Sequence, residues 1–100
     1  AMVEFKFAKY GENFGTREMG AKIRQELLVL LEGDERIVLD FTGVNVVTNS
    51  FADECIAKLL LDMPLAELKK KTTFRGLNPV AGKSVLVALQ RRYKVLGSSK

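Results

Sequence analysis

The fold is decided by residues 36–54, which read RIVLDFTGVNVVTNSFADE. Residues 36–41 contain an unbroken apolar run with Asp40 near its end, which is typical of a central strand buried on both faces. Residues 42–49 mix small, polar and apolar side chains and predict a connecting loop. Ser50 then opens a helix as the first residue of SFAD, a capping-box pattern. The stretch predicts strand, loop and helix in succession.

The residues before this stretch predict a strand and a helix. Residues 3–7 alternate apolar and polar side chains, the pattern of a strand with one buried face. Residues 11–15 read as a loop, Thr16 is a suitable helix cap, and Gly33 is a suitable end. The apolar stripe of this helix consists of Met19, Ile23, Leu27 and Leu30 or Leu31.

The residues after the stretch predict a second and a third helix with a weaker strand between them. The second helix has its apolar residues at Ala52, Cys55, Ile56, Leu59, Leu60 and Met63. Pro64 ends it, residues 65–71 form a turn or short helix, and residues 72–77 form the strand. Asn78 caps the third helix, Pro79 is its first residue, and residues 97–100 are a mobile tail. Its stripe is Val85, Leu89, Tyr93 and Leu96.

This alternation predicts an α/β fold with a mainly parallel sheet of three to four strands packed against about three helices. The first strand is a candidate for an antiparallel edge. A chain of 100 residues has the size of one domain, with residues 2–96 as its ordered core. Ala1 precedes Met2, and we expect the natural chain to start at Met2.

Composition narrows the class of protein. Hydrophobic residues make up 47% and charged residues 28% of the chain, close to a globular average. The longest apolar run, residues 27–31, is too short to span a membrane, and no signal peptide is recognisable. Cys55 is the single cysteine, so no internal disulfide is possible. We expect a soluble, cytoplasmic protein.

Positive charge is concentrated in the second half of the chain. Residues 1–50 carry six bases and eight acids, whereas residues 51–100 carry ten bases and four acids. A solvated basic face is the favoured interpretation, because no aromatic residues interleave with the bases. The alternative is a nucleic-acid-associated regulator, or the partner domain of a DNA-binding protein. The anion-attracting residues would be Lys69, Lys70, Lys71, Arg75, Arg91 and Arg92.

The sequence predicts no catalysis, no metal and no cofactor. The chain has no histidine, and Cys55 lies on the predicted buried stripe. Residues 76–84, GLNPVAGKS, are similar to a phosphate-binding loop. Five residues separate its glycines instead of four, and one is a proline without an N–H, so the phosphate cradle would be wrong. We therefore expect a binding protein rather than an enzyme.

Two segments within residues 36–54 carry a resemblance to a known family. Asp40-Phe41-Thr42-Gly43-Val44 and Ser50-Phe51-Ala52-Asp53-Glu54 resemble the STAS family of anti-sigma factor antagonist domains, and more closely its STAS-like relatives. Residues 14–18, FGTRE, resemble the start of the first helix in those relatives. The resemblance covers residues 14–92. Unlike sigma-regulatory members, the chain has Thr48 and Asn49 before the serine and Phe51 after it.

The resemblance implies a regulatory protein-interaction module of STAS-like fold, with Ser50 as the candidate phosphoacceptor. The implied partner is a kinase-like ATPase or an anti-sigma-like regulator. Its binding surface would be the start of the second helix together with the loop of residues 41–47. The candidate partner-binding residues are Thr48, Asn49, Phe51, Asp53, Glu54 and Asp40. The resemblance leaves the oligomeric state and the binding of any small ligand open.

Each of these residues also has an ordinary structural interpretation. Ser50 as a helix cap would stabilise the helix by about 1 kcal/mol, and a phosphate there would be tolerated by the helix dipole. Asp53 would complete the cap and Glu54 would face solvent. Asp40 would accept hydrogen bonds from the N–H groups of the following loop. Thr48 and Asn49 are common turn residues, and Thr48 is a second phosphoacceptor candidate.

Overall fold

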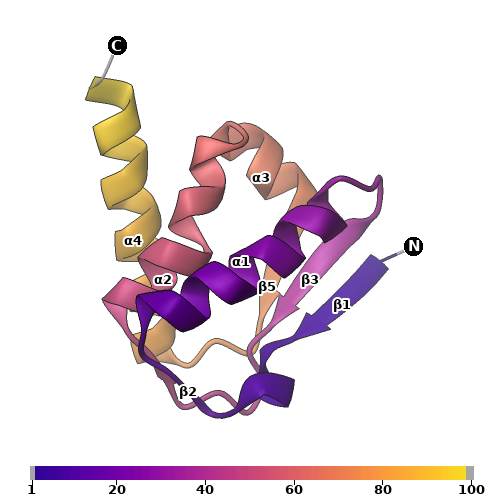
Figure 1. Ribbon diagram of the computed structural model, residues 1–100, viewed down its shortest axis with the longest axis vertical. Coiled ribbons are helices and arrows are strands. Elements are labelled where there is room, and N and C mark those ends of the chain that lie inside the picture. Colours follow the sequence, from indigo (N-terminus) through magenta and orange to yellow (C-terminus); the bar gives the residue numbers. More distant parts are fainter. Residues whose placement is uncertain (1, 99–100) are drawn as a thin grey trace.

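Three parallel strands, in the spatial order β1-β3-β5, form the main sheet in a computed structural model that describes residues 2–98 (Figure 1). The predicted α/β class and the parallel sheet are confirmed. The elements in chain order are β1 (Met2–Lys6), the 3-10 helix η1 (Phe7–Tyr10), β2 (Asn13–Phe14), α1 (Arg17–Leu31), β3 (Arg36–Asp40), β4 (Val46–Val47), α2 (Asn49–Cys55), the 3-10 helix η2 (Ala57–Leu61), α3 (Leu65–Lys71), β5 (Thr72–Arg75) and α4 (Pro79–Ser98).

The edge strand β1 runs parallel to β3, so the antiparallel alternative is wrong. Its register pairs Val3 with Ile37 and Phe5 with Leu39. β2 and β4 form a separate two-stranded parallel sheet inside segments predicted as loops. This small sheet pairs Phe14 with Val47 and thereby joins the chain before α1 to the chain before α2.

Three of the helices pack on one another in a row. α1 packs on α2, and α2 packs on α4. In Figure 1, α4 lies on the opposite side of the molecule from β1. Within the residues that the structure describes, no helix is long and apolar enough to cross a membrane.

Residues of the central strand β3 are buried from Ile37 to Asp40, as expected for a strand covered on both faces. Arg75 of β5 and Glu4 of β1 form an ion pair of 2.8 Å. Because β1 and β5 flank β3, this pair crosses over the central strand. Val38 is only 2% exposed, so the charged side chains of neighbouring strands help to cover the face that it occupies.

Two predicted helix N-caps agree with the structure, and the C-terminal ends of two helices differ from the prediction. Thr16 accepts a hydrogen bond from the N–H of Met19, and Asn78 accepts one from Ala81, so both predicted caps are confirmed. The α-helix predicted to run as far as Pro64 ends at Cys55, because hydrogen bonds such as Leu59 N–H to the Ile56 carbonyl tighten the next turn into η2.

The other difference concerns the end of α4, whereas α1 ends as predicted. Its last residue is Leu31, its C-cap is Glu32, and the N–H of the following Gly33 donates to the Leu30 carbonyl. α4 continues through residues 97 and 98, which were predicted to belong to a mobile tail, while residues 99 and 100 lie outside the described residues, as does Ala1. Tyr93 is 59% exposed although it was assigned to the buried stripe, so the second half of α4 packs less closely than its sequence pattern indicates.

An aromatic cluster holds together the loops at the carboxyl ends of β1 and β3. Phe7 stacks on Phe41 with ring centroids 3.9 Å apart, and Phe14 contacts Phe7 edge-on. All three rings are at most 1% exposed. Burial of large aromatic surfaces stabilises this region strongly, so the loop from Phe41 to Thr48 leads to α2 from a fixed position.

Candidate functional site

Thr48, not Ser50, caps the second helix. The hydroxyl of Thr48 accepts a hydrogen bond of 3.1 Å from the Phe51 N–H and donates one of 3.1 Å to the Gly15 carbonyl. The prediction that Ser50 is the cap is therefore wrong, because α2 begins at Asn49. Ser50 lies exposed in the first turn of the helix, where its hydroxyl is not needed as the cap.

Phe51 fixes the first turn of α2 to the core. Its ring is fully buried and lies 5.1 Å from the ring of Phe14, between centroids. Phe51 therefore presents no surface to a partner, whereas Asn49 and Ser50, which lie between Thr48 and Phe51 in the chain, are exposed. The packing of Phe51 makes the exposed pair part of a rigid surface.

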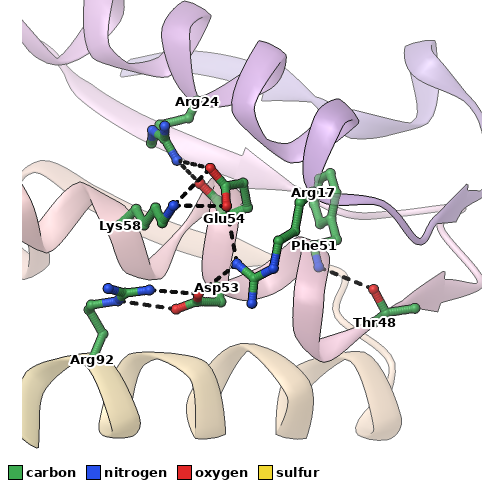
Figure 2. A network of polar contacts seen from close by, with 8 residues as sticks. All are labelled: Arg17, Arg24, Thr48, Phe51, Asp53, Glu54, Lys58 and Arg92. Carbon is green, nitrogen blue, oxygen red and sulfur yellow. Dashed lines mark hydrogen bonds and ion pairs between the residues drawn. The ribbon is translucent and has the colours of Figure 1, made fainter. Parts of the chain in front are cut away.

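Glu54 is buried inside a cluster of cations, and the prediction that it faces solvent is wrong. The residue is 8% exposed. Its carboxylate accepts hydrogen bonds from Arg17 at 3.1 Å, from Arg24 at 3.0 Å and from Lys58 at 3.1 Å (Figure 2). Arg24 also donates to the main-chain carbonyl of Glu54. Burial of the carboxylate is tolerated because three positive groups surround it.

Asp53 links α2 to both neighbouring helices. The prediction that it completes the cap is therefore wrong. Arg17 of α1 donates to its Oδ2 at 2.8 Å, and Arg92 of α4 donates to the same oxygen at 2.7 Å. Figure 2 shows Asp53 between these two arginines. The carboxylate thus ties three helices together through charge-assisted hydrogen bonds.

These contacts keep both carboxylates of α2 ionised. Burial by itself would raise the pKa of Asp53, but hydrogen bonds from Arg92 and Arg17 outweigh it and lower the pKa. The pKa of Glu54 falls from 4.5 to about 2, mainly because Lys58 donates to its carboxylate, with further lowering by the two arginines of α1. The site is therefore a charged network at neutral pH.

A groove opens beside this network, between the first turn of α2 and the middle of α4. Its volume is about 350 Å³. Its lining includes Arg17, Ser50, Asp53, Val87, Arg91 and Arg92. Arg91 is exposed, and its guanidinium has no hydrogen-bond or ion-pair partner among the described residues. The groove therefore combines a free guanidinium with the hydroxyl of Ser50 and an apolar side.

Asp40 lies away from this groove, at the carboxyl end of β3. The residue is 7% exposed, and its Oδ1 accepts a hydrogen bond of 2.9 Å from the Thr42 N–H. Asp40 therefore accepts a hydrogen bond from the N–H of the following loop, as predicted. Hydrogen bonds from the Thr42 side chain and backbone lower the pKa of Asp40. Arg75 lies 3.7 Å from its other oxygen.

The predicted basic residues come from three separate elements. Lys69 and Lys70 are exposed on α3, whereas Lys71 donates to the Leu31 carbonyl at 2.8 Å. Arg75 pairs with Glu4, as described above, and Arg92 pairs with Asp53, so only part of the predicted set remains available to an anionic partner.

Sequence reasoning missed Arg17, Arg24 and Lys58, the three cations around Glu54. A spacing pattern on α1 could have identified two of them, because positions 17, 20 and 24 lie on one face of a helix. Gly20, in the middle of that face, lets α1 approach α2: a Cβ atom there would lie 3.0 Å from Glu54 Cβ. The glycine brings both arginines within reach of the carboxylates.

Comparison with known proteins identifies one family. The family model described as "STAS-like domain of unknown function (DUF4325)" matches residues 19–81, which include β3, α2 and β5. No curated protein and no solved structure matches the chain. The matched segment contains Ser50, Asp53 and Glu54, and ends before Arg91 and Arg92.

Proposed function

Since the chain belongs to the family of STAS-like domains, we propose that it is a non-catalytic, cytoplasmic regulatory module that acts by binding another protein. The partner is a kinase-like ATPase or an anti-sigma-like regulator, the class implied by the resemblance to anti-sigma factor antagonist domains. The contact surface is the exposed part of the start of α2, with Asn49 and Ser50, and the exposed residues of the loop that precedes it.

The position of Ser50 carries this proposal. Its hydroxyl is exposed on a turn that Phe51 and Thr48 hold in place, so modification would not remove a structural contact. The partner kinase would transfer the γ-phosphoryl group of ATP to Oγ, forming a phosphate ester and releasing ADP and the hydroxyl proton. The phosphate would add a charge of about −1.5 to −2 to the contact surface.

The test is retention of partners by the wild type, Ser50→Ala and Ser50→Asp from a native lysate. Retained proteins are identified by mass, and circular dichroism verifies that each variant is folded. We expect at least one kinase-like or regulatory protein to bind the wild type and Ser50→Ala but not Ser50→Asp, or the reverse.

Gln25→Glu provides the matched control, because Gln25 is exposed on α1 and the change adds the same single negative charge away from α2. It should retain the same proteins as the wild type. Identical retention by the wild type and both Ser50 variants would show that Ser50 is not a switch.

A further inference from the structure

We propose that the groove between α2 and α4 binds an acidic segment of the protein partner, with Arg91 as the main anchor for a carboxylate. This inference rests on the proposed function and assigns a binding site and a partner chemistry to it. The groove is lined on one side by the first turn of α2 and on the other by α4.

Charge is the first argument. Three lining arginines, Arg17, Arg91 and Arg92, face a single lining acid, Asp53, which leaves the groove at +2. Arg17 and Arg92 are already oriented by their hydrogen bonds to Asp53. Arg91 has no such partner among the described residues and is exposed. An incoming carboxylate would therefore find one unpaired guanidinium beside two that are held in place.

The apolar part of the lining argues for a peptide rather than a nucleic acid. Val87 and Ala88 of α4 form part of the groove, and none of the described residues that line it has an aromatic ring on which a base could stack. A segment with Asp or Glu next to Leu or Val would place its carboxylate on Arg91 and its apolar side chain on Val87. Such a groove combines charge recognition with burial of apolar surface.

Ser50 lines the same groove, which gives phosphorylation a direct consequence. A phosphate on its Oγ would bring the net charge of the lining from +2 to about 0. It would also compete for the guanidinium that the acidic segment needs. Phosphorylation at Ser50 would then weaken binding by supplying the anion from within the chain.

The experiment is a titration of the full chain with a labelled peptide, Gly-Glu-Leu-Glu-Glu-Leu-Gly, followed by fluorescence anisotropy and by amide chemical shifts. We expect shifts confined to residues 49–53 and 87–92. Arg91→Gln should weaken binding about tenfold, the loss of one strong charge-assisted contact. Ser50→Asp should weaken it at least about threefold, whereas Ser50→Ala should not.

Lys83→Gln is the matched control, because Lys83 is exposed on the same helix, outside the groove, and carries the same charge. It should change the affinity less than about twofold. A peptide with Gln in place of each Glu should not bind.

Three results would overturn the proposal: no shifts at millimolar peptide, equal weakening by Arg91→Gln and Lys83→Gln, or shifts that centre on Lys69 and Lys70. Tighter, Arg91-dependent binding of a single-stranded DNA oligonucleotide would instead assign the groove to nucleic acid. If the acidic peptide fails while lysate partners still depend on Ser50, the groove inference falls and the proposed function stands.

Discussion

Arg92 of α4 holds the carboxylate of Asp53 with two hydrogen bonds, from Nε to Oδ1 at 3.2 Å and from Nη2 to Oδ2 at 2.7 Å. This bidentate contact is specific to a guanidinium, because the single ammonium of lysine cannot donate two parallel hydrogen bonds to both carboxylate oxygens. The two residues are 39 positions apart in the sequence, so the pair fixes α4 against α2.

Arg92→Lys should therefore lower the free energy of unfolding by about 1 kcal/mol, as expected when a half-buried bidentate pair loses one hydrogen bond. Urea unfolding followed by circular dichroism measures the change. Arg91→Lys is the neighbouring control and should change stability by less than about 0.5 kcal/mol, because Arg91 is exposed. Equal effects of the two substitutions would contradict the structural role of the pair.

Thr48→Ala should cost about 1 kcal/mol of stability, because it removes the hydroxyl that accepts from Phe51 N–H. Ser50→Ala should stay within about 0.5 kcal/mol of the wild type, because that hydroxyl is exposed. Urea denaturation of both variants decides between the two candidate caps. A larger loss for Ser50→Ala would mean that Ser50 caps the helix in solution.

The stabilisation supplied by Glu54 should be lost in acid. Its pKa in the folded protein is lowered to about 2 from 4.5, so the ionised carboxylate stabilises the fold above pH 4.5, and this contribution fades as the pH falls towards 2. Glu54→Gln should therefore be clearly less stable than the wild type at pH 7, and the gap should narrow between pH 4.5 and pH 2.

Urea unfolding curves of the wild type and Glu54→Gln at several pH values measure this gap. Glu32→Gln corrects for the general loss of one negative charge, because Glu32 is exposed at the end of α1. If the difference in stability stays constant down to pH 2, the cations around Glu54 do not keep its carboxylate ionised.

Local patterns predicted most of the secondary structure but not the site. The alternation in β1, the apolar run of β3 and the caps at Thr16 and Asn78 depend on neighbours in sequence, which a single chain displays directly. The cap at Thr48 was missed because Ser50 is an equally good cap residue and begins the better-known pattern. The structure selects Thr48, because its hydroxyl accepts from the N–H of Phe51, whose ring packs in the core.

The burial of Glu54 depends on residues that local patterns cannot relate to it. Arg24 and Arg17 are 30 and 37 positions away from Glu54 in the sequence. Of the three cations that compensate its charge, only Lys58 is a near neighbour in the sequence. Burial of a charge depends on tertiary contacts, and without partners a sequence argument assigns glutamate to the surface. The apolar spacing correctly predicted that Ala52 and Cys55 are buried, but it did not predict that Glu54 is buried beside them.

Cys55 should be unreactive in the folded protein. The side chain is fully buried, and burial raises the pKa of its thiol above its ordinary range. Ellman's reagent at pH 8 should label one thiol only when urea unfolds the chain. Ser50→Cys supplies the contrast, because its new, exposed thiol should react at once in the native state. Rapid labelling of native wild type would show that α2 opens readily.

Gly20→Ala should destabilise the protein even though alanine favours a helix by about 1 kcal/mol over glycine. The added Cβ would lie 3.0 Å from Glu54 Cβ and 3.2 Å from the Phe51 carbonyl oxygen, so α1 would have to move away from α2. We expect a net loss of about 1–2 kcal/mol, typical of overpacking. Arg17 and Arg24 would move with the helix, so the ion pairs of Glu54 would lengthen.

Gly97→Ala tests the same substitution without the contact, because a Cβ at this position of α4 would have no other part of the described chain within 4 Å. It should leave stability unchanged or raise it slightly, since only the helix preference acts there. Thermal unfolding of both variants gives the comparison. If Gly20→Ala proves as stable as Gly97→Ala, α1 and α2 have room to separate, and the close approach that brings Arg17 and Arg24 to Glu54 is not required by the fold.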